Sequence, residues 1–210
     1  MARYSQTKQL WSQWYQKGNY AQSTNQPDNI QTSRHLVDTY GPKMEDCAIF
    51  CELGAGSGRN IYYFHQKHTE WTYKGNDINP NIHNEIKSVY PDLLSWTDIQ
   101  IIDTLSYLRK DDFHTDITFT HGHLMHLPGD VIKEVCSLID EKTRRYILLH
   151  EAYINDRGIS LAKRLKYRKY RFDRDYEGMF AGFLLEEKHI TEHPVKKGIR
   201  YCTYFLKKQR

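Results

Sequence analysis

The sequence predicts a doubly wound α/β fold, with a mostly parallel sheet and an antiparallel hairpin at its C-terminal end. Short apolar runs alternate with amphipathic segments through most of the chain, which is typical of strands joined by crossover helices. Three glycines at alternate positions follow the first apolar run, where a strand should turn into a helix. The last two apolar runs are joined by the short segment PVKKG, which indicates a hairpin.

The composition indicates one domain without a membrane segment. The chain has 210 residues, and no tract rich in Pro, Gly, Ser or a single charge divides it. Its four cysteines form no C-x-x-C pair, and no apolar stretch reaches the length of a signal peptide or a membrane helix. We therefore expect a cytoplasmic protein in a reducing compartment.

The first two expected strands lie on either side of the glycines and the helix that follows them. We place the first strand at residues 48–53 and the helix at 59–67, where apolar residues recur at helical spacing. A second strand at 71–79 should lead into a helix with Asn79 as its N-cap, ending before Pro91.

The remaining core elements follow the same rhythm. We expect strands at 95–103, 116–124 and 144–153, with an amphipathic helix at 129–141 before the last of them. The two runs of the terminal hairpin then lie at 182–193 and 200–208.

Two further segments surround this core. Aromatic residues before the first strand, among them Trp11, Trp14 and Tyr15, suggest a helix and a loop that fold back over the open end of the sheet. Residues 163–174 hold seven of the thirty Lys and Arg residues, in a basic helical stretch after the fifth strand.

The glycines lie where a parallel sheet binds its ligands, beyond the carboxyl ends of the strands. Gly54, Gly56 and Gly58 occupy the turn after the first strand and would let a ligand approach the bare backbone. A dinucleotide fingerprint would need its third glycine at position 59, where the chain has Arg59. The spacing therefore argues against NAD.

The segment ELGAGSG at residues 52–58 resembles the first motif of class I S-adenosyl-L-methionine (SAM)-dependent methyltransferases. The resemblance covers roughly residues 48–153 by ordered motifs. It implies the Rossmann-like class I methyltransferase fold, SAM as cofactor, and a loop that packs against the amino acid part of SAM. The cofactor contacts that it implies in this motif are Glu52, Gly54, Ala55, Gly56, Gly58 and Asn60.

Two acidic residues extend this expected cofactor site. Asp77, about twenty residues after the glycines, could accept hydrogen bonds from both ribose hydroxyls, although it could instead cap a helix. Asp103 is the better candidate to meet the adenine amino group, Asp98 is the weaker one, and either could be a surface carboxylate. The remaining expected cofactor contacts are Ile78, Thr104, Thr120 and His121.

Three histidines at the end of the fourth strand are the candidate catalytic residues. A base is needed only when the acceptor carries a proton, and histidine is the side chain best suited to accept one near pH 7. We expect His123 or His126 to act as base or acceptor-binding group, with His121 beside the cofactor loop. The alternative is that each simply packs in the fold. No cysteine or carboxylate partner marks a metal site, so we expect none.

The acceptor is expected to be a small anionic molecule. The fourth strand lacks a segment resembling D/N-P-P-Y, which disfavours methylation of nucleic acid bases. Arginines after the fifth strand could bind an anion. The expected substrate-binding residues are Tyr20, Glu151, Arg171 and Arg174, with Glu151 also a candidate acid or base.

The sequence thus predicts a SAM-dependent methyltransferase acting on oxygen or nitrogen. The segments THGHLMHLPGDVIKEV and GNYAQSTN are similar to small methylases associated with pseudaminic acid and other surface-sugar biosynthesis. We expect a lid at residues 1–45, a cofactor-binding core at 46–153, and an acceptor-pocket insert with the hairpin at 154–210. The alternative is a non-catalytic SAM-fold module that binds RNA or a protein through its basic face. The sequence gives no indication of the oligomeric state.

Overall fold

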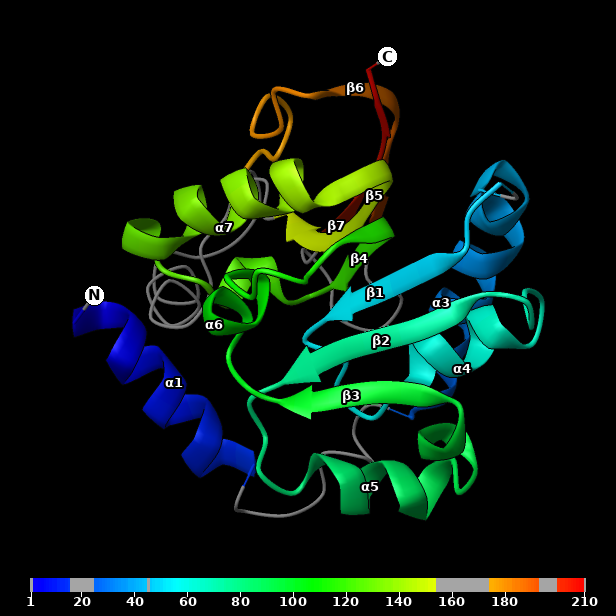
Figure 1. Cartoon of the computed structure of the whole chain (residues 1–210), viewed down its shortest axis with the longest axis vertical. Coiled ribbons are helices and arrows are strands. Elements are labelled where there is room, and N and C mark those ends of the chain that lie inside the picture. The colour runs from blue at the N-terminus through cyan, green and yellow to red at the C-terminus, as the bar shows by residue number, and fades with distance from the viewer. Residues whose placement is uncertain (1, 16–24, 45, 154–173, 193–199, 210) are drawn as a thin grey trace.

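One seven-stranded sheet forms the centre of the molecule. The computed structural model describes residues 2–15, 25–44, 46–153, 174–192 and 200–209. The strand order is β3-β2-β1-β4-β5-β7-β6 (Figure 1), and β7 lies antiparallel between β5 and β6 while the other pairs are parallel. The predicted doubly wound, mostly parallel sheet with an antiparallel hairpin is confirmed.

The elements lie close to their predicted positions. The strands are β1 (Ile49–Leu53), β2 (Thr72–Asp77), β3 (Thr97–Ile101), β4 (Thr115–His121), β5 (Thr143–Tyr153), β6 (Phe183–Glu192) and β7 (Arg200–Lys208). The α-helices are α1 (Ala2–Tyr15), α3 (Pro27–Tyr40), α4 (Arg59–His65), α5 (Ile82–Val89), α6 (Thr104–Leu108) and α7 (Gly129–Lys142). Three short 3-10 helices are η1 (Gly41–Met44), η2 (Leu93–Ser95) and η3 (Leu124–His126).

Helices cover both faces of the sheet and give the molecule two apolar cores. Phe50 and Phe119 belong to the core beneath α3, α4 and α5, whereas Cys51 and Leu149 belong to the core beneath α6 and α7. Figure 1 shows α6 and α7 on one side of the sheet and α3 and α4 on the other. The central strands β1 and β4 are buried along almost their whole length, although only β1 (IFCEL) is mainly apolar, and threonines alternate with Ile117 and Phe119 in β4 (TDITFTH).

None of the described helices has the length and apolar character that crossing a membrane requires. The longest of them, α1, α3 and α7, have 14 residues each.

Three details differ from the sequence prediction. The described part of the N-terminal region holds two helices, α1 and α3, where one helix and a loop were expected, and the five-residue α6 was not predicted. The N-cap of α5 is Asn81, so the prediction of Asn79 was wrong. The helix begins at Ile82, and the Asn79 side chain holds the turn just before it: its oxygen accepts from the Asn81 backbone N–H at 2.9 Å, as an N-cap side chain does, and its nitrogen donates to Glu85 at 2.9 Å.

Gly75 in β2 allows a close approach between two strands. It pairs with Glu52 of β1, and a Cβ atom at position 75 would lie 2.7 Å from the Glu52 carbonyl oxygen. We expect Gly75→Ala to lower the free energy of unfolding by about 1–3 kcal/mol, because the contact is with backbone and can be relieved only by moving a strand.

Urea denaturation of the Gly75→Ala variant checks this prediction. Gly129→Ala is the matched control, since a Cβ atom there meets nothing within 4 Å and should change stability by less than about 0.5 kcal/mol. Equal stability of the two variants would show that the strands can move apart at no cost.

Candidate functional site

The glycine turn after β1 requires a left-handed backbone at all three glycines. The φ angles are 68° at Gly54, 55° at Gly56 and 76° at Gly58. Residues other than glycine rarely adopt this backbone conformation. The turn is held against β2 by the Ala55 N–H, which donates to the Asn76 carbonyl at 2.8 Å. The sequence therefore identified a turn that does need its glycines.

The imidazole of His123 packs directly on this turn. A Cβ atom at Gly54 would lie 2.2 Å from the His123 Nδ1 atom, and the Nε2 atom of the same ring is 2.7 Å from the Thr104 Oγ1 atom. His123 thus joins the loops that follow β1, β3 and β4. This contact requires a glycine at position 54 whether or not a cofactor binds.

Asp77 places a buried carboxylate beside the same turn. Its side chain is 3% exposed and accepts hydrogen bonds from the Gly56 N–H at 2.9 Å and the Asn79 N–H at 2.8 Å. Burial raises the pKa of Asp77, and these hydrogen bonds oppose the rise. The backbone of the half-buried Ile78 also donates to this carboxylate, which can accept about four hydrogen bonds, so about one acceptor position remains at the end of β2.

Glu52 is the second buried carboxyl group of this region. Its Oε1 atom accepts from the Asn60 amide at 2.6 Å, while its Oε2 atom has no hydrogen-bond partner among the described residues. Burial raises the pKa of Glu52 to about 8. The protonated, uncharged form is therefore favoured at neutral pH.

A polar network links this carboxyl group to β4. The Ser33 hydroxyl of α3 donates to the Asn60 oxygen at 2.6 Å and accepts from the Arg59 Nε atom at 2.8 Å. The His121 Nδ1 atom lies 3.3 Å from the same Asn60 oxygen and 3.5 Å from an Arg59 nitrogen. Sequence reasoning used Arg59 only to exclude a dinucleotide motif and missed its place in this network.

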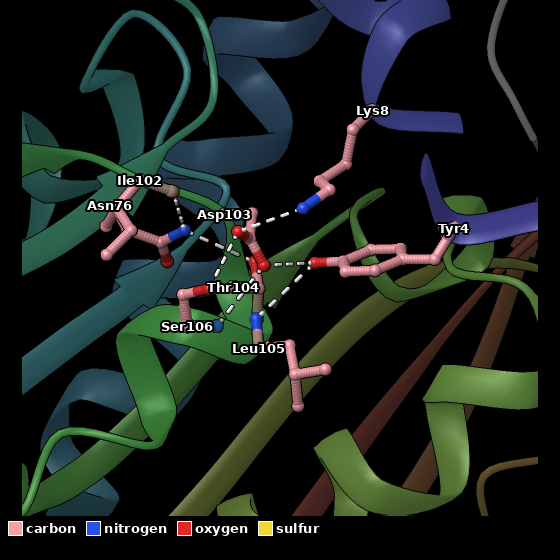
Figure 2. Close-up of polar contacts among 8 residues, drawn as sticks. All are labelled: Tyr4, Lys8, Asn76, Ile102, Asp103, Thr104, Leu105 and Ser106. Atoms are coloured by element: carbon pink, nitrogen blue, oxygen red, sulfur yellow. Dashed lines mark hydrogen bonds and ion pairs between the residues drawn. The ribbon is translucent and has the colours of Figure 1, made fainter. Parts of the chain in front are cut away.

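Asp103 lies at the start of α6 and is held by α1 (Figure 2). It accepts from the Tyr4 hydroxyl at 2.6 Å, forms an ion pair with Lys8 at 3.3 Å, and caps α6 through Ser106. Burial alone would raise the pKa of Asp103, but the hydrogen bonds from Tyr4 and Ser106 and the charge of Lys8 lower it. The residue expected near adenine is thus the anchor of the first helix.

The three candidate catalytic histidines have different surroundings. Burial lowers the pKa of His123 to about 4, and burial together with His150 and Arg59 holds the pKa of His121 well below its usual range. Both are uncharged and weakly basic at neutral pH. His126 packs edge-to-face on Trp11 of α1, with 4.4 Å between ring centroids. A basic role for His126 stays a hypothesis.

Glu151 lies beneath the turn after β4 instead of facing an open site. The residue is 1% exposed, and its carboxylate accepts from the Thr120 hydroxyl at 2.8 Å. It also accepts from three consecutive backbone N–H groups, those of His123, Leu124 and Met125, at 3.0, 3.1 and 3.0 Å. Thr120 is likewise occupied by this bond. Glu151 therefore holds the turn after β4 in place through these hydrogen bonds.

Arg174 holds the same turn from the other side. Its guanidinium group donates to the Leu124 carbonyl at 3.1 Å and the Leu127 carbonyl at 2.5 Å. Two of its five N–H donors are therefore bound to backbone carbonyls of η3 and of the residue that follows it. The other two expected acceptor contacts, Tyr20 and Arg171, lie outside the described residues.

A cavity of about 260 Å³ lies between α3 and the strands β4, β5, β7 and β6. We call it the histidine cavity, because its lining includes His35, His121, His150, His189, Tyr201 and Thr203. Of these residues sequence reasoning found only His121. The pairing of the fourth and fifth strands, which places His121 opposite His150, was the signal that could have revealed the second.

Comparison with known proteins places this site in a known fold. No protein-family model and no curated protein sequence matches the chain. Among solved structures, a 1,6-didemethyltoxoflavin-N1-methyltransferase from Burkholderia thailandensis, crystallised with its substrate and S-adenosylhomocysteine, is similar with a TM-score of 0.70 and 15% identity. The alignment covers 100% of this chain and 90% of that one.

Other methyltransferase structures are similar to the same degree. A magnesium protoporphyrin IX methyltransferase from Synechocystis gives a TM-score of 0.67 at 15% identity, over 91% of this chain and 88% of that one. Against a mitomycin 7-O-methyltransferase the TM-score is 0.64 at 11% identity, over 86% of this chain but 54% of that one. The chain has the fold of class I SAM-dependent methyltransferases.

The raised pKa of Glu52 predicts a pH dependence of stability. An unfolded glutamate has a pKa of about 4.3, so the folded protein retains a proton up to about pH 8 that the unfolded chain has released. Stability from this group therefore falls as the pH rises between these two values. The Glu52→Gln variant should lose less stability than wild type between about pH 5 and about pH 8.

Urea denaturation of both proteins across this pH range measures the difference. The low-pKa histidines contribute equally to both proteins, so the difference isolates position 52. Parallel stability curves would mean that Glu52 is ionised in the folded protein at neutral pH.

Proposed function

We propose that this protein is a SAM-dependent methyltransferase that methylates a small-molecule acceptor. The observation that carries the proposal is the buried Asp77 carboxylate, which lies against the left-handed glycine turn of a class I methyltransferase fold and retains acceptor capacity. Structures of neighbours crystallised with SAM or S-adenosylhomocysteine support the choice of cofactor.

The residues present fit such a cofactor. Asp77 would accept a hydrogen bond from a ribose hydroxyl, and the backbone from Gly54 to Gly58 would lie along the amino acid part. Asp103 already accepts four hydrogen bonds, from Tyr4, Lys8 and Ser106, so a contact with the adenine amino group would have to replace one of them. When bound, SAM supplies a methyl group activated by a positively charged sulfur.

The protein itself positions the reacting groups and holds the histidines beside the glycine turn in their uncharged form. Buried carboxyl groups at Glu52 and Asp77 lie beside the turn, and the low pKa values of His121 and His123 leave no imidazolium charge there, so the guanidinium of Arg59 is the positive charge of this network. Because a cationic ligand would be repelled by an imidazolium charge, uncharged histidines suit this site. Holding two reactants in a fixed geometry can by itself lower a barrier by about 7–11 kcal/mol.

The acceptor is proposed to be a small molecule, as it is for the toxoflavin-precursor enzyme. The expectation of an anionic acceptor rested on Arg171 and Arg174, of which the first lies outside the described residues and the second binds backbone carbonyls. The alternative of an RNA-binding module rested on residues 163–174, and Arg174 is the described member of that segment.

Substitution of Asp77 tests the proposed cofactor site. The Asp77→Asn variant removes the negative charge and one acceptor oxygen, so we expect its affinity for S-adenosylhomocysteine to fall at least tenfold in isothermal titration calorimetry. Asp111→Asn is the control, because that exposed residue precedes β4 at the opposite edge of the sheet. Circular dichroism checks that both variants are folded.

The same titration can refute the assignment. Unchanged affinity in a folded Asp77→Asn variant would remove the ribose contact, and absence of binding to the wild type would remove the proposed function.

A further inference from the structure

The histidine cavity adjoins the proposed cofactor site through one shared side chain. On one side, His121 contacts Asn60 and Arg59 of the helix that follows the glycine turn. On the other side its ring meets His150 edge-to-face, with 4.7 Å between centroids and 84° between planes. The His121 ring alone would therefore separate a molecule in the cavity from the polar network beside the glycine turn.

The inner wall of the cavity is built from stacked rings. His150 and Tyr201 lie parallel, with 4.8 Å between centroids and 2° between planes, and His121 stands at 82° to the Tyr201 ring. The Nδ1 atom of His150 is 2.8 Å from the Thr203 hydroxyl, while its Nε2 atom makes no hydrogen bond to any described residue. The ring stacking and this hydrogen bond hold the wall in position, and the His150 Nε2 atom can still form a hydrogen bond with a ligand.

The charges around the cavity disfavour an anion. The described residues that line the cavity include no lysine or arginine. They include two carboxylates, Asp28 and Glu192. Arg200 pairs with Glu192 at 3.3 Å, which leaves Asp28 as the carboxylate at the wall without a described ion-pair partner. Burial lowers the pKa of His150 to about 3, so this ring is uncharged at neutral pH. A negatively charged ligand would lose its water here without meeting a lysine or arginine among the described lining residues, and the guanidinium of Arg59 lies outside that lining, 3.5 Å from the His121 ring.

We propose that the histidine cavity binds the methyl acceptor, and that the acceptor is a small molecule with amine or hydroxyl donors and no negative charge; this rests on the proposed function. Aromatic rings with a nearby carboxylate favour ammonium and hydroxyl groups over carboxylates. The volume of about 260 Å³ lies just below the range of roughly 300–1,000 Å³ of pockets for drug-sized ligands, which limits the acceptor to a small molecule.

Two matched compounds test the predicted charge preference. Tyramine and 4-hydroxyphenylacetate share a phenol ring and differ in carrying an ammonium or a carboxylate group. With the protein saturated with S-adenosylhomocysteine and its histidine rings labelled with carbon-13, we expect tyramine to shift the NMR signals of His150 and His189. We also expect it to bind at least tenfold more tightly than 4-hydroxyphenylacetate.

Filling the cavity tests the location. Thr32 lines the cavity from α3 and Thr191 lines it from β6, so Thr32→Trp and Thr191→Trp should each abolish the tyramine-induced shifts. Asp38→Trp, at an exposed position of α3, is the matched control and should bind tyramine as the wild type does. Two filling variants on different elements guard against misfolding of either one.

Three outcomes would overturn the inference: equal or tighter binding of 4-hydroxyphenylacetate, wild-type tyramine binding by both folded filling variants, or no histidine shift with either compound. Calorimetry with S-adenosylhomocysteine separates this failure from failure of the proposed function. If that ligand binds wild type and Thr32→Trp equally while the tyramine result is negative, the methyltransferase proposal stands and the acceptor site is elsewhere. If that ligand binds neither protein, the methyltransferase proposal fails.

Discussion

The turn after β4 depends on one buried carboxylate, and the candidate site depends on that turn. Glu151 accepts hydrogen bonds from three consecutive backbone N–H groups and from the Thr120 hydroxyl. Each of these donors would otherwise be buried without a partner, at a cost of about 1–3 kcal/mol. The carboxylate therefore ties the end of β5 to the backbone that carries His123, and Arg174 secures the carbonyl groups of the same turn.

From this fixed turn, side chains reach the neighbouring loops. The His123 ring, carried by the turn after β4, contacts Gly54 in the loop after β1 and Thr104 after β3, so a single ring connects these three loops. At the end of β2, Asp77 holds the glycine turn by accepting a hydrogen bond from the Gly56 N–H. These contacts are formed within the protein itself, so the geometry proposed for cofactor binding is present before a ligand arrives. Such preorganisation reduces the ordering that binding would otherwise require.

Burial also decides the charges of the site. It raises the pKa of Glu52 and lowers those of His121, His123 and His150, so these groups tend to be uncharged at neutral pH. The proposed cofactor site and the histidine cavity share these uncharged rings and are joined through His121, beside which Arg59 supplies a positive charge. A cationic cofactor on one side and an acceptor without negative charge on the other are both compatible with uncharged rings.

The sequence by itself determined the sheet, the glycine turn and the position of Asp77. These features depend on local patterns: apolar runs mark buried strands, and glycine spacing marks a left-handed turn. The tertiary structure alone decided that Glu151 and Arg174 hold a turn, that His123 packs on Gly54, and that His35, His150 and Tyr201 share a cavity with His121. These residues are far apart in the chain. Their partners and their charge states follow from burial between elements, which no local pattern in the sequence specifies.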